Sequence, residues 1–169
     1  MIKSLLVFVL VSLAFVLFET SILTNLLFLP SVPDLLLLCS LYVSVNNGKL
    51  YGASSGFISG FFLDFLSVSP FGLNCLLRTI IGYVAGIFSK SLNIVGFFIP
   101  AFLGILATLV KALLIWFISI FFVNSVNSYN LLSVQFLFEL GANAILTPFV
   151  FKFLGIFDKM LLLEPGEIK

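Results

Sequence analysis

Short polar breaks divide an otherwise continuous apolar sequence into six segments, and this pattern limits the chain to a bundle of membrane-spanning helices. Of the 169 residues, 62% are hydrophobic and only 9% are charged, and the mean hydropathy is +1.30. Soluble domains carry about 25% charged residues, so a chain of this composition cannot hide its apolar surface from water. We therefore expect one all-α polytopic membrane domain over residues 1–169.

The six apolar segments predict transmembrane helices over residues 4–29, 33–46, 50–66, 72–89, 95–123 and 133–155. Because a helix perpendicular to the bilayer needs about 20 residues to cross it, the second segment is short. The fifth is long enough to tilt or to extend beyond the membrane. In an alternative arrangement, residues 33–66 form a re-entrant hairpin. That hairpin would place Lys49 near the middle of the membrane, which is costly, so two true spans are favoured.

Lysines gather in alternate connections and so predict the orientation of the chain. The lysines that precede, join or follow the segments on one side are Lys3, Lys49, Lys90, Lys152, Lys159 and Lys169. The three opposite connections, at residues 30–33, 67–71 and 124–132, contain neither Lys nor Arg. The positive-inside rule then puts both termini in the cytoplasm. No small-x-small cleavage site follows the first segment, so we expect an uncleaved span rather than a signal peptide.

The composition argues against several classes of function. Histidine is absent, which removes the commonest acid–base side chain and metal ligand. Cys39 and Cys75 lie in separate apolar runs and are expected to be buried apolar side chains, not metal or redox groups. The net charge is +1 without a basic or acidic block, so nucleic acid is not an expected partner. We expect no enzymatic activity, no cofactor and no metal site.

Charges inside the apolar segments are informative, because each costs at least a few kcal/mol unless it is paired. There are five of them, Glu19, Asp64, Arg78, Lys111 and Glu139. At about 1.5 Å of rise per residue, all five lie in the outer half of the bilayer. We expect Lys111 to pair with Glu139 or Glu19. A proton or ion path is the alternative, and it is disfavoured because the charges do not reach the cytoplasmic half.

The third and fourth segments each carry glycines and charges at a strict spacing of four residues. The members are Gly52, Gly56, Gly60 and Asp64 on the third segment, and Arg78, Gly82, Gly86 and Lys90 on the fourth. Residues four apart share a helix face, and faces of small residues let helix backbones approach closely. The turn Ser69-Pro70-Phe71-Gly72 can reverse the chain quickly, because Pro70 fixes φ and Gly72 permits left-handed geometry. A tight antiparallel hairpin is therefore predicted.

Pairing residues symmetrically about this turn sets the expected register of the hairpin. It matches Asp64 with Arg78 as an ion pair near the outer mouth, and Gly60 with Gly82. By the same count Gly56 faces Gly86, and Gly52 faces Lys90. A second interpretation competes with the hairpin. In it, the face formed by Gly52, Gly56 and Gly60 docks a helix of another protein, and Asp64 is reserved for that partner.

Three stretches of this sequence resemble one known family. VPDLLLLCSLY (32–42) is similar to its Pro-(Asp/Asn) entry to the second span, and ANAILTPFVF (142–151) to its Asn-x4-Pro segment. GFISGFFLDFLSVSPFGLNCLLRTIIGYV (56–84) carries its Gly-x3-Gly, Leu-Asp and Ser/Pro turn. Through these motifs the chain resembles MreD, the small integral-membrane component of the bacterial rod-shape system, or elongasome. Arg78 departs from the family pattern.

The resemblance implies a non-enzymatic scaffold in the bacterial cytoplasmic (inner) membrane. It implies binding to MreC, and work beside MreB filaments, the glycosyltransferase RodA and its class B penicillin-binding transpeptidase in lateral peptidoglycan synthesis. The family also resembles in fold the six-helix substrate-binding components of energy-coupling-factor vitamin transporters, which makes a solute-binding component the alternative. Such components carry an Ala-x-x-x-Ala face on the first span, whereas Ala14 has no alanine four positions away. An intramembrane enzyme ranks third, because no nucleophile–base set is present.

Overall fold

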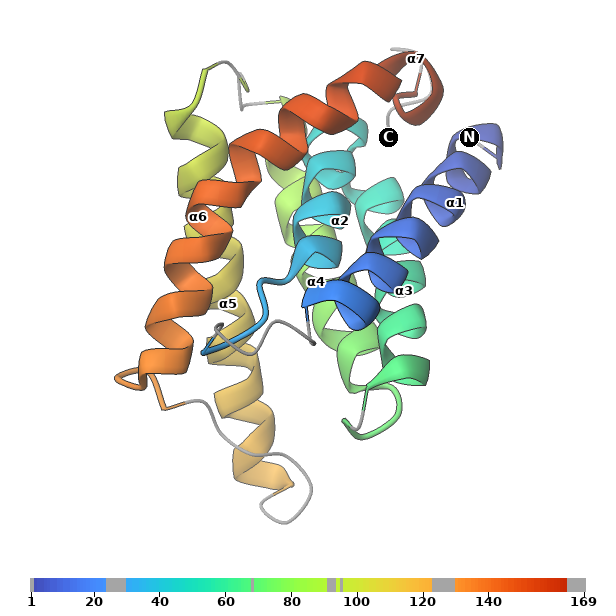
Figure 1. The fold of residues 1–169 in the computed structure, drawn as a ribbon. Coiled ribbons are helices and arrows are strands. Elements are labelled where there is room, and N and C mark those ends of the chain that lie inside the picture. Colours follow the sequence, from blue (N-terminus) through green and yellow to red (C-terminus); the bar gives the residue numbers. More distant parts are fainter. Residues whose placement is uncertain are drawn as a thin grey trace.

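The computed structural model describes residues 2–23, 30–67, 69–90, 94, 96–122 and 130–163, and this part of the chain is an all-helical bundle (Figure 1). Its main helices are α1 (Ile2–Phe18), α2 (Leu35–Asn47), α3 (Lys49–Leu66), α4 (Leu73–Ile87), α5 (Phe98–Phe121) and α6 (Val134–Leu154). A π-helical turn (Glu19–Leu23), two 3₁₀ turns (Phe88–Lys90 and Gly155–Phe157) and the short α7 (Asp158–Leu161) complete it. Each predicted segment corresponds to one main helix, and the predicted residues 24–29, 95 and 123 lie outside the described residues.

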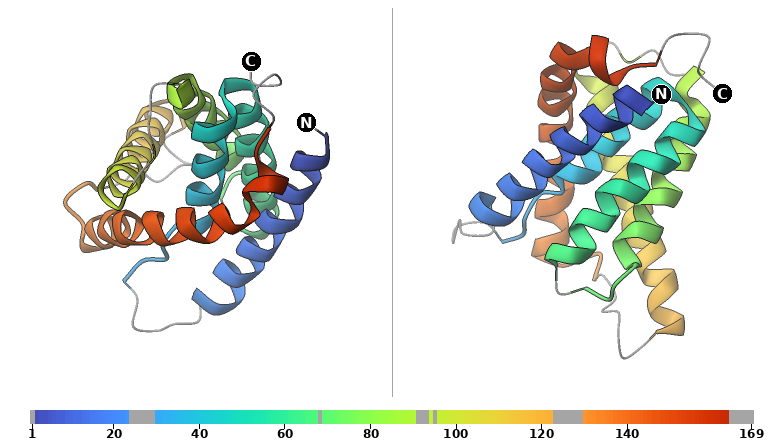
Figure 2. Two further views of the ribbon diagram at one scale, coloured as in Figure 1. Left: turned by 90° about the horizontal axis from the view of Figure 1, so that it is seen from above. Right: turned by 90° about the vertical axis from the view of Figure 1, so that its right-hand side faces the viewer.

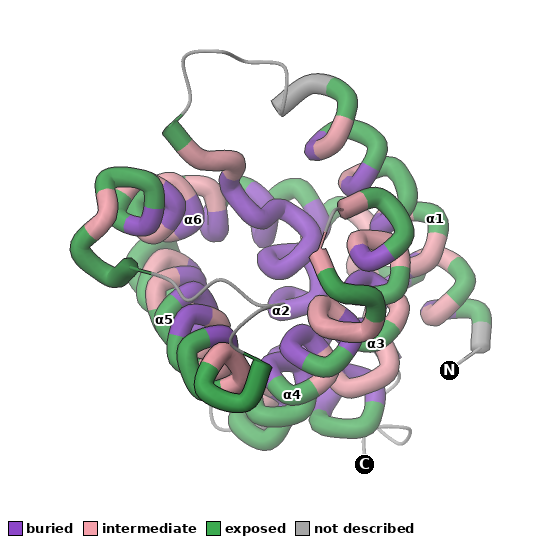
Figure 3. Tube along the Cα trace, turned by 90° about the horizontal axis from the view of Figure 1, so that it is seen from below, coloured by how far each residue is buried: buried purple, intermediate pink, exposed green. Residues whose placement is uncertain are grey.

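Helix α2 is the centre of the bundle. Every residue of it except Asn46 is buried, including Ser40 and Ser44, whose hydroxyl groups donate to carbonyls of the same helix. Helices α1, α3, α4, α5 and α6 all pack against it, and Figure 3 shows it enclosed by its neighbours. Its 13 residues span only about 20 Å, less than the ~30 Å of hydrocarbon. Its N-terminal end is buried, with Leu36 fully shielded.

Helices α3 and α4 pack more closely than any other pair in the described residues. The glycines of α3 lie against the backbone of α4. A Cβ atom on Gly52 would overlap the carbonyl oxygen of Gly82, and one on Gly56 would overlap that of Arg78. A Cβ on Gly60 would lie 2.5 Å from the carbonyl oxygen of Asn74. Only glycine permits this approach, so the stripe is used inside the hairpin.

The symmetric register expected for this hairpin is wrong. Gly52 faces Gly82 rather than Lys90. Gly82 is eight residues (90 minus 82) nearer the turn than Lys90, or about 12 Å along α4. The pairings of Gly60 with Gly82 and of Gly56 with Gly86 fail by the same shift. The reason lies in the connection, where the first turn of α4 sits beside Asp64 and is capped by it. Symmetric counting assumes that both helices continue to the turn, and they do not.

The end of the chain folds back on the bundle. Asn47, at the end of α2, donates from Nδ2 to the Leu161 carbonyl (2.9 Å) and accepts from the Leu163 amide (2.8 Å). Leu161 is fully buried. Leu163 is buried as well, so residues 158–163 pack on the bundle although Lys159 and Met160 are exposed. Residues 164–169 lie outside the described part.

The N-terminal end of α1 and α7 pack together at the same end of the bundle, as Figure 2 shows from two sides. Lys3, Lys49 and Lys159 are exposed. Within the described residues, three helical stretches are long and apolar enough to cross a membrane, Lys3–Ser21, Phe98–Phe121 and Val134–Leu161. Helices α2 and α4 are apolar but shorter. Large apolar side chains cover their outer faces, including Leu6, Leu10 and Phe98. This surface is that of a membrane protein.

Substitution of Gly56 by alanine tests the hairpin contact. The new methyl group would meet the Arg78 carbonyl, and such overpacking costs about 1–3 kcal/mol. Gly141→Ala is the matched control, because nothing lies within 4 Å of a Cβ at that helical position. There alanine adds up to about 1 kcal/mol of helix propensity. We expect Gly56→Ala alone to lower the melting temperature of the detergent-solubilised protein, and equal stability of the two variants would contradict the close packing.

Candidate functional site: a buried ionic cluster

The first turn of α2 poses a hydrogen-bonding problem, because the first N–H groups of a helix have no partner within it and this turn is shielded from water. The structure supplies an acceptor for each. The Leu35 amide donates to the Pro33 carbonyl (3.2 Å), and the Leu36 amide to Glu19 Oε2 (3.3 Å). The Leu37 amide donates to Asp34 Oδ1 (2.9 Å), the N-cap of the helix. Two carboxylates therefore cap a buried helix end.

These carboxylates are balanced by cations from other helices. Arg78 of α4 donates from Nη2 to Asp34 Oδ1. Lys111 of α5 lies with Nζ 2.8 Å from Asp34 Oδ2 and 2.7 Å from Glu139 Oε1 of α6. Arg78, Asp34 and Glu139 are all less than 5% exposed. Because buried charges are tolerated only when paired, each member keeps the others in place. We call Glu19, Asp34, Arg78, Lys111 and Glu139 the ionic cluster.

A second, uncharged network continues the ionic cluster along α6. Asn143 accepts from the Asp34 amide at Oδ1 (3.0 Å) and donates from Nδ2 to Thr108 Oγ1 (3.0 Å). Thr108 in turn donates to the Gly104 carbonyl of α5 (2.9 Å). Asn143 and Thr108 are both buried. The side-chain amide of Asn143 thus joins α6 to the start of α2 and to α5, one turn from Glu139.

The sequence predicts that Lys111 pairs with Glu139 or Glu19, and the structure brings Lys111 together with Glu139. Asp34, which joins Lys111 to Arg78, was not among the predicted site residues. The available signal was an aspartate directly after Pro33 and before an apolar run, the pattern of a helix N-cap. Asn143 was likewise not selected as a site residue. Both belong to stretches that carried the family resemblance, and they meet at 3.0 Å.

The predicted Asp64–Arg78 ion pair is wrong. Asp64 accepts from the backbone amides of Gly72 (3.0 Å), Asn74 (3.0 Å) and Cys75 (3.1 Å), and so caps α4. Arg78, one turn farther along α4, reaches α2 instead. The docking interpretation of the glycine face also fails, since α4 covers that face and Asp64 is engaged within the hairpin.

The turn between α3 and α4 uses the two residues expected of it. The Pro70 carbonyl accepts from the Leu73 amide (3.1 Å), and Gly72 has φ +93° in the left-handed region at the start of α4. Gly82 and Gly86 lie against the backbones of Gly52 and Gly48. Gly82 and Gly86 therefore contribute packing, whereas Arg78 of the same segment belongs to the ionic cluster.

The ionic cluster is built to hold helices together. Cys39 and Cys75 are buried and free, and no group of three or more metal-ligating His, Cys, Asp or Glu side chains occurs among the described residues. Arg78 Nη1 is buried without a hydrogen-bond partner there. The described side chains around the cluster include no nucleophile paired with a base. Its chemistry is charge compensation across α1, α2, α4, α5 and α6.

Removal of single charges tests the ionic cluster. Lys111→Leu removes the cation that Glu139 and Asp34 share, and breaking a buried pair costs about 3–5 kcal/mol. We expect a large loss of monodisperse protein on size-exclusion chromatography. Adding Glu139→Leu should recover part of it, because Arg78 still compensates Asp34. Lys3→Leu, at an exposed lysine, is the control and should have little effect. No recovery in the double variant would rule out the pairing.

The part of the chain that contains these residues matches a known protein family. Residues 1–157 match the family model of the rod shape-determining protein MreD. No curated protein and no solved structure matches the chain. The matched region contains the whole ionic cluster, the α3–α4 hairpin and the Asp34–Asn143 contact. The chain therefore belongs to the MreD family of rod shape-determining membrane proteins.

Proposed function

We propose that this protein is a non-enzymatic scaffold of the cell-elongation machinery, which binds MreC in the cytoplasmic membrane and supports lateral peptidoglycan synthesis. Its further partners would be MreB, RodA and the class B penicillin-binding transpeptidase. Membership of the MreD family supports the rod-shape role. The observation that carries the scaffold proposal is the ionic cluster. Its charged side chains pair with one another between helices.

A scaffold must present its partner-binding surfaces in a fixed arrangement. The ionic cluster supports this because its members come from five different helical elements. Glu19 follows α1 and accepts from the Leu36 amide of α2. Arg78 links α4 to the start of α2, and Lys111 links α5 to both α2 and α6. Interactions among buried charges are strong when each is paired, so the helices resist independent movement.

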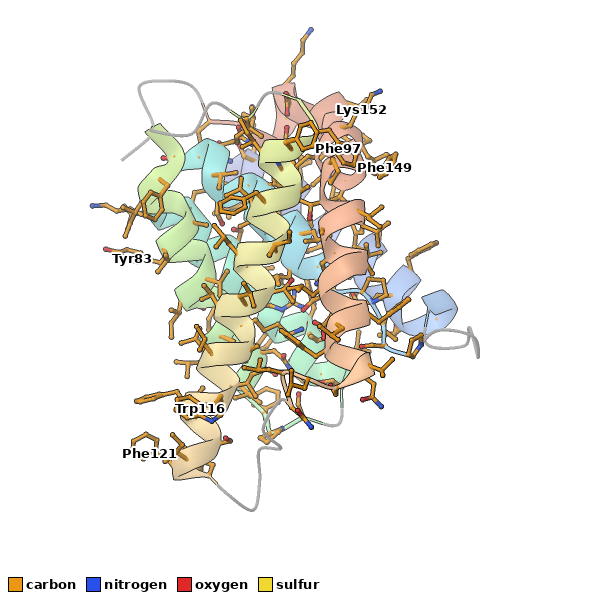
Figure 4. The ribbon with its side chains drawn as sticks, turned by 90° about the vertical axis from the view of Figure 1, so that its left-hand side faces the viewer. Tyr83, Phe97, Trp116, Phe121, Phe149 and Lys152 are labelled. Carbon is orange, nitrogen blue, oxygen red and sulfur yellow. The ribbon has the colours of Figure 1, made fainter. Side chains whose placement is uncertain are left out.

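We infer a six-span topology with both termini in the cytoplasm. The exposed Lys3 and Lys49, at the end formed by α1 and α7, support this through the positive-inside rule. At the opposite end α5 extends beyond its neighbours, and Figure 4 shows Trp116 and Phe121 there, 52% and 69% exposed. Tryptophan is enriched at membrane–water interfaces, which fits the outer surface. The predicted likeness to energy-coupling-factor components stays a prediction.

Cysteine labelling tests the topology. Single cysteines at Lys49 and Asn130 are introduced after Cys39 and Cys75, which are buried, have been replaced by alanine. A membrane-impermeant maleimide should label position 130 in intact spheroplasts and position 49 only after permeabilisation. The reverse pattern would invert the orientation. Equal labelling of both positions in intact spheroplasts would contradict the six-span arrangement.

Co-purification tests the scaffold role. The detergent-solubilised protein should retain the MreC-like protein of its own organism, and cells depleted of it should lose their rod shape. Asp34→Ala should restore neither property, because it leaves Arg78 and Lys111 without a shared carboxylate. Gly141→Ala should restore both. Thermal stabilisation by a member of a vitamin panel, without retention of any elongation partner, would instead favour the solute-binding alternative.

A further inference from the structure

A cavity of about 590 Å³ lies at the end of the bundle that carries α7. It is bounded by the C-terminal end of α2, the beginning of α5 and the second half of α6. This volume is within the usual ~300–1,000 Å³ range of small-molecule sites. None of the ionic cluster borders it, so it is a separate feature of the molecule.

Two side chains of opposite charge border this cavity. Lys152, on α6, is exposed and takes part in no ion pair in the described part of the chain. Asp158, at the start of α7, is half-buried and accepts a hydrogen bond from the Tyr42 hydroxyl group. That contact holds the carboxylate at the wall, and its second oxygen accepts no hydrogen bond from the described residues. The cavity therefore offers one cation and one anchored anion.

The rest of the wall is mostly apolar. Phe97 and Phe149 are 49% and 60% exposed, and their rings meet edge to face at 6.3 Å. Figure 4 shows both rings close to Lys152 at the upper end of the bundle. Phe149 precedes Lys152 by three residues, which places it about 4.5 Å deeper along α6. It also borders a wholly apolar groove of about 440 Å³ between α1 and α6. The charged group of Lys152 thus lies nearer the end of the bundle than this apolar surface.

We propose that this cavity binds the headgroup of a phosphatidylethanolamine-type lipid from the adjoining leaflet, with its phosphate on Lys152 and its ammonium on Asp158. An ammonium and a phosphate in one headgroup match one carboxylate and one lysine, whereas a net anionic headgroup leaves the carboxylate facing a like charge. The acyl chains leave over Phe97 and Phe149 into the bilayer. This site is independent of the scaffold role.

Lipid retention measured by native mass spectrometry tests the proposal. Delipidated protein is mixed with equal amounts of phosphatidylethanolamine and phosphatidylglycerol that carry identical acyl chains. The wild-type protein should retain the ethanolamine lipid preferentially. Lys152→Gln should lower retention of this lipid by about fivefold, the effect of one partly exposed ionic contact. Asp158→Asn should abolish the preference by raising retention of the glycerol lipid, while asparagine can still accept from the Tyr42 hydroxyl.

Lys159→Gln is the matched control, because it removes the same charge at a neighbouring exposed position that does not border the cavity. Lys159→Gln should retain both lipids to the same extent as the wild-type protein. Equal retention of the two lipids by the wild-type protein would overturn the proposal. So would an equal loss of the ethanolamine lipid in Lys152→Gln and Lys159→Gln, which would indicate attraction by the charged end of the bundle alone.

Discussion

The buried N-terminal end of α2 is the constraint on which the rest of this structure depends. A 13-residue helix cannot cross the hydrocarbon, so it begins among its neighbours, where water cannot reach its amides. Glu19, Asp34 and Asn143 supply the missing acceptors. Carboxylates so placed need positive charge, and Arg78 and Lys111 provide it from two other helices. The ionic cluster therefore follows from one short helix.

Close packing of the hairpin and compensation of charge are coupled. Arg78 lies on α4 where its backbone touches Gly56 of α3, and its side chain extends to Asp34 on α2. A larger residue at position 56 would move α4 away and with it the guanidinium group. Gly104 likewise lets α5 approach Thr147 and Asn143 of α6, about two turns from Lys111 and Glu139. Small residues set the spacing that the ionic cluster needs.

The interior of the protein and its surface differ in where charged side chains lie. The interior contains the charges and uses them between helices, while the outer faces of α1, α5 and α6 present apolar side chains. The surface of this MreD-family protein is therefore mostly apolar along these helices. Lys152 and Asp158 lie instead at the end that carries α7, where they border the cavity.

Sequence alone determined the six helices and the glycine face of α3, because hydropathy and spacing along one helix are local properties. It could not determine which residues of two helices meet. The register of α3 against α4 follows from Asp64 capping α4, and symmetric counting missed it by eight residues. The partner of Arg78 follows from where α2 begins. Tertiary structure decided these points, because each depends on backbone amides that need an acceptor in a medium without water.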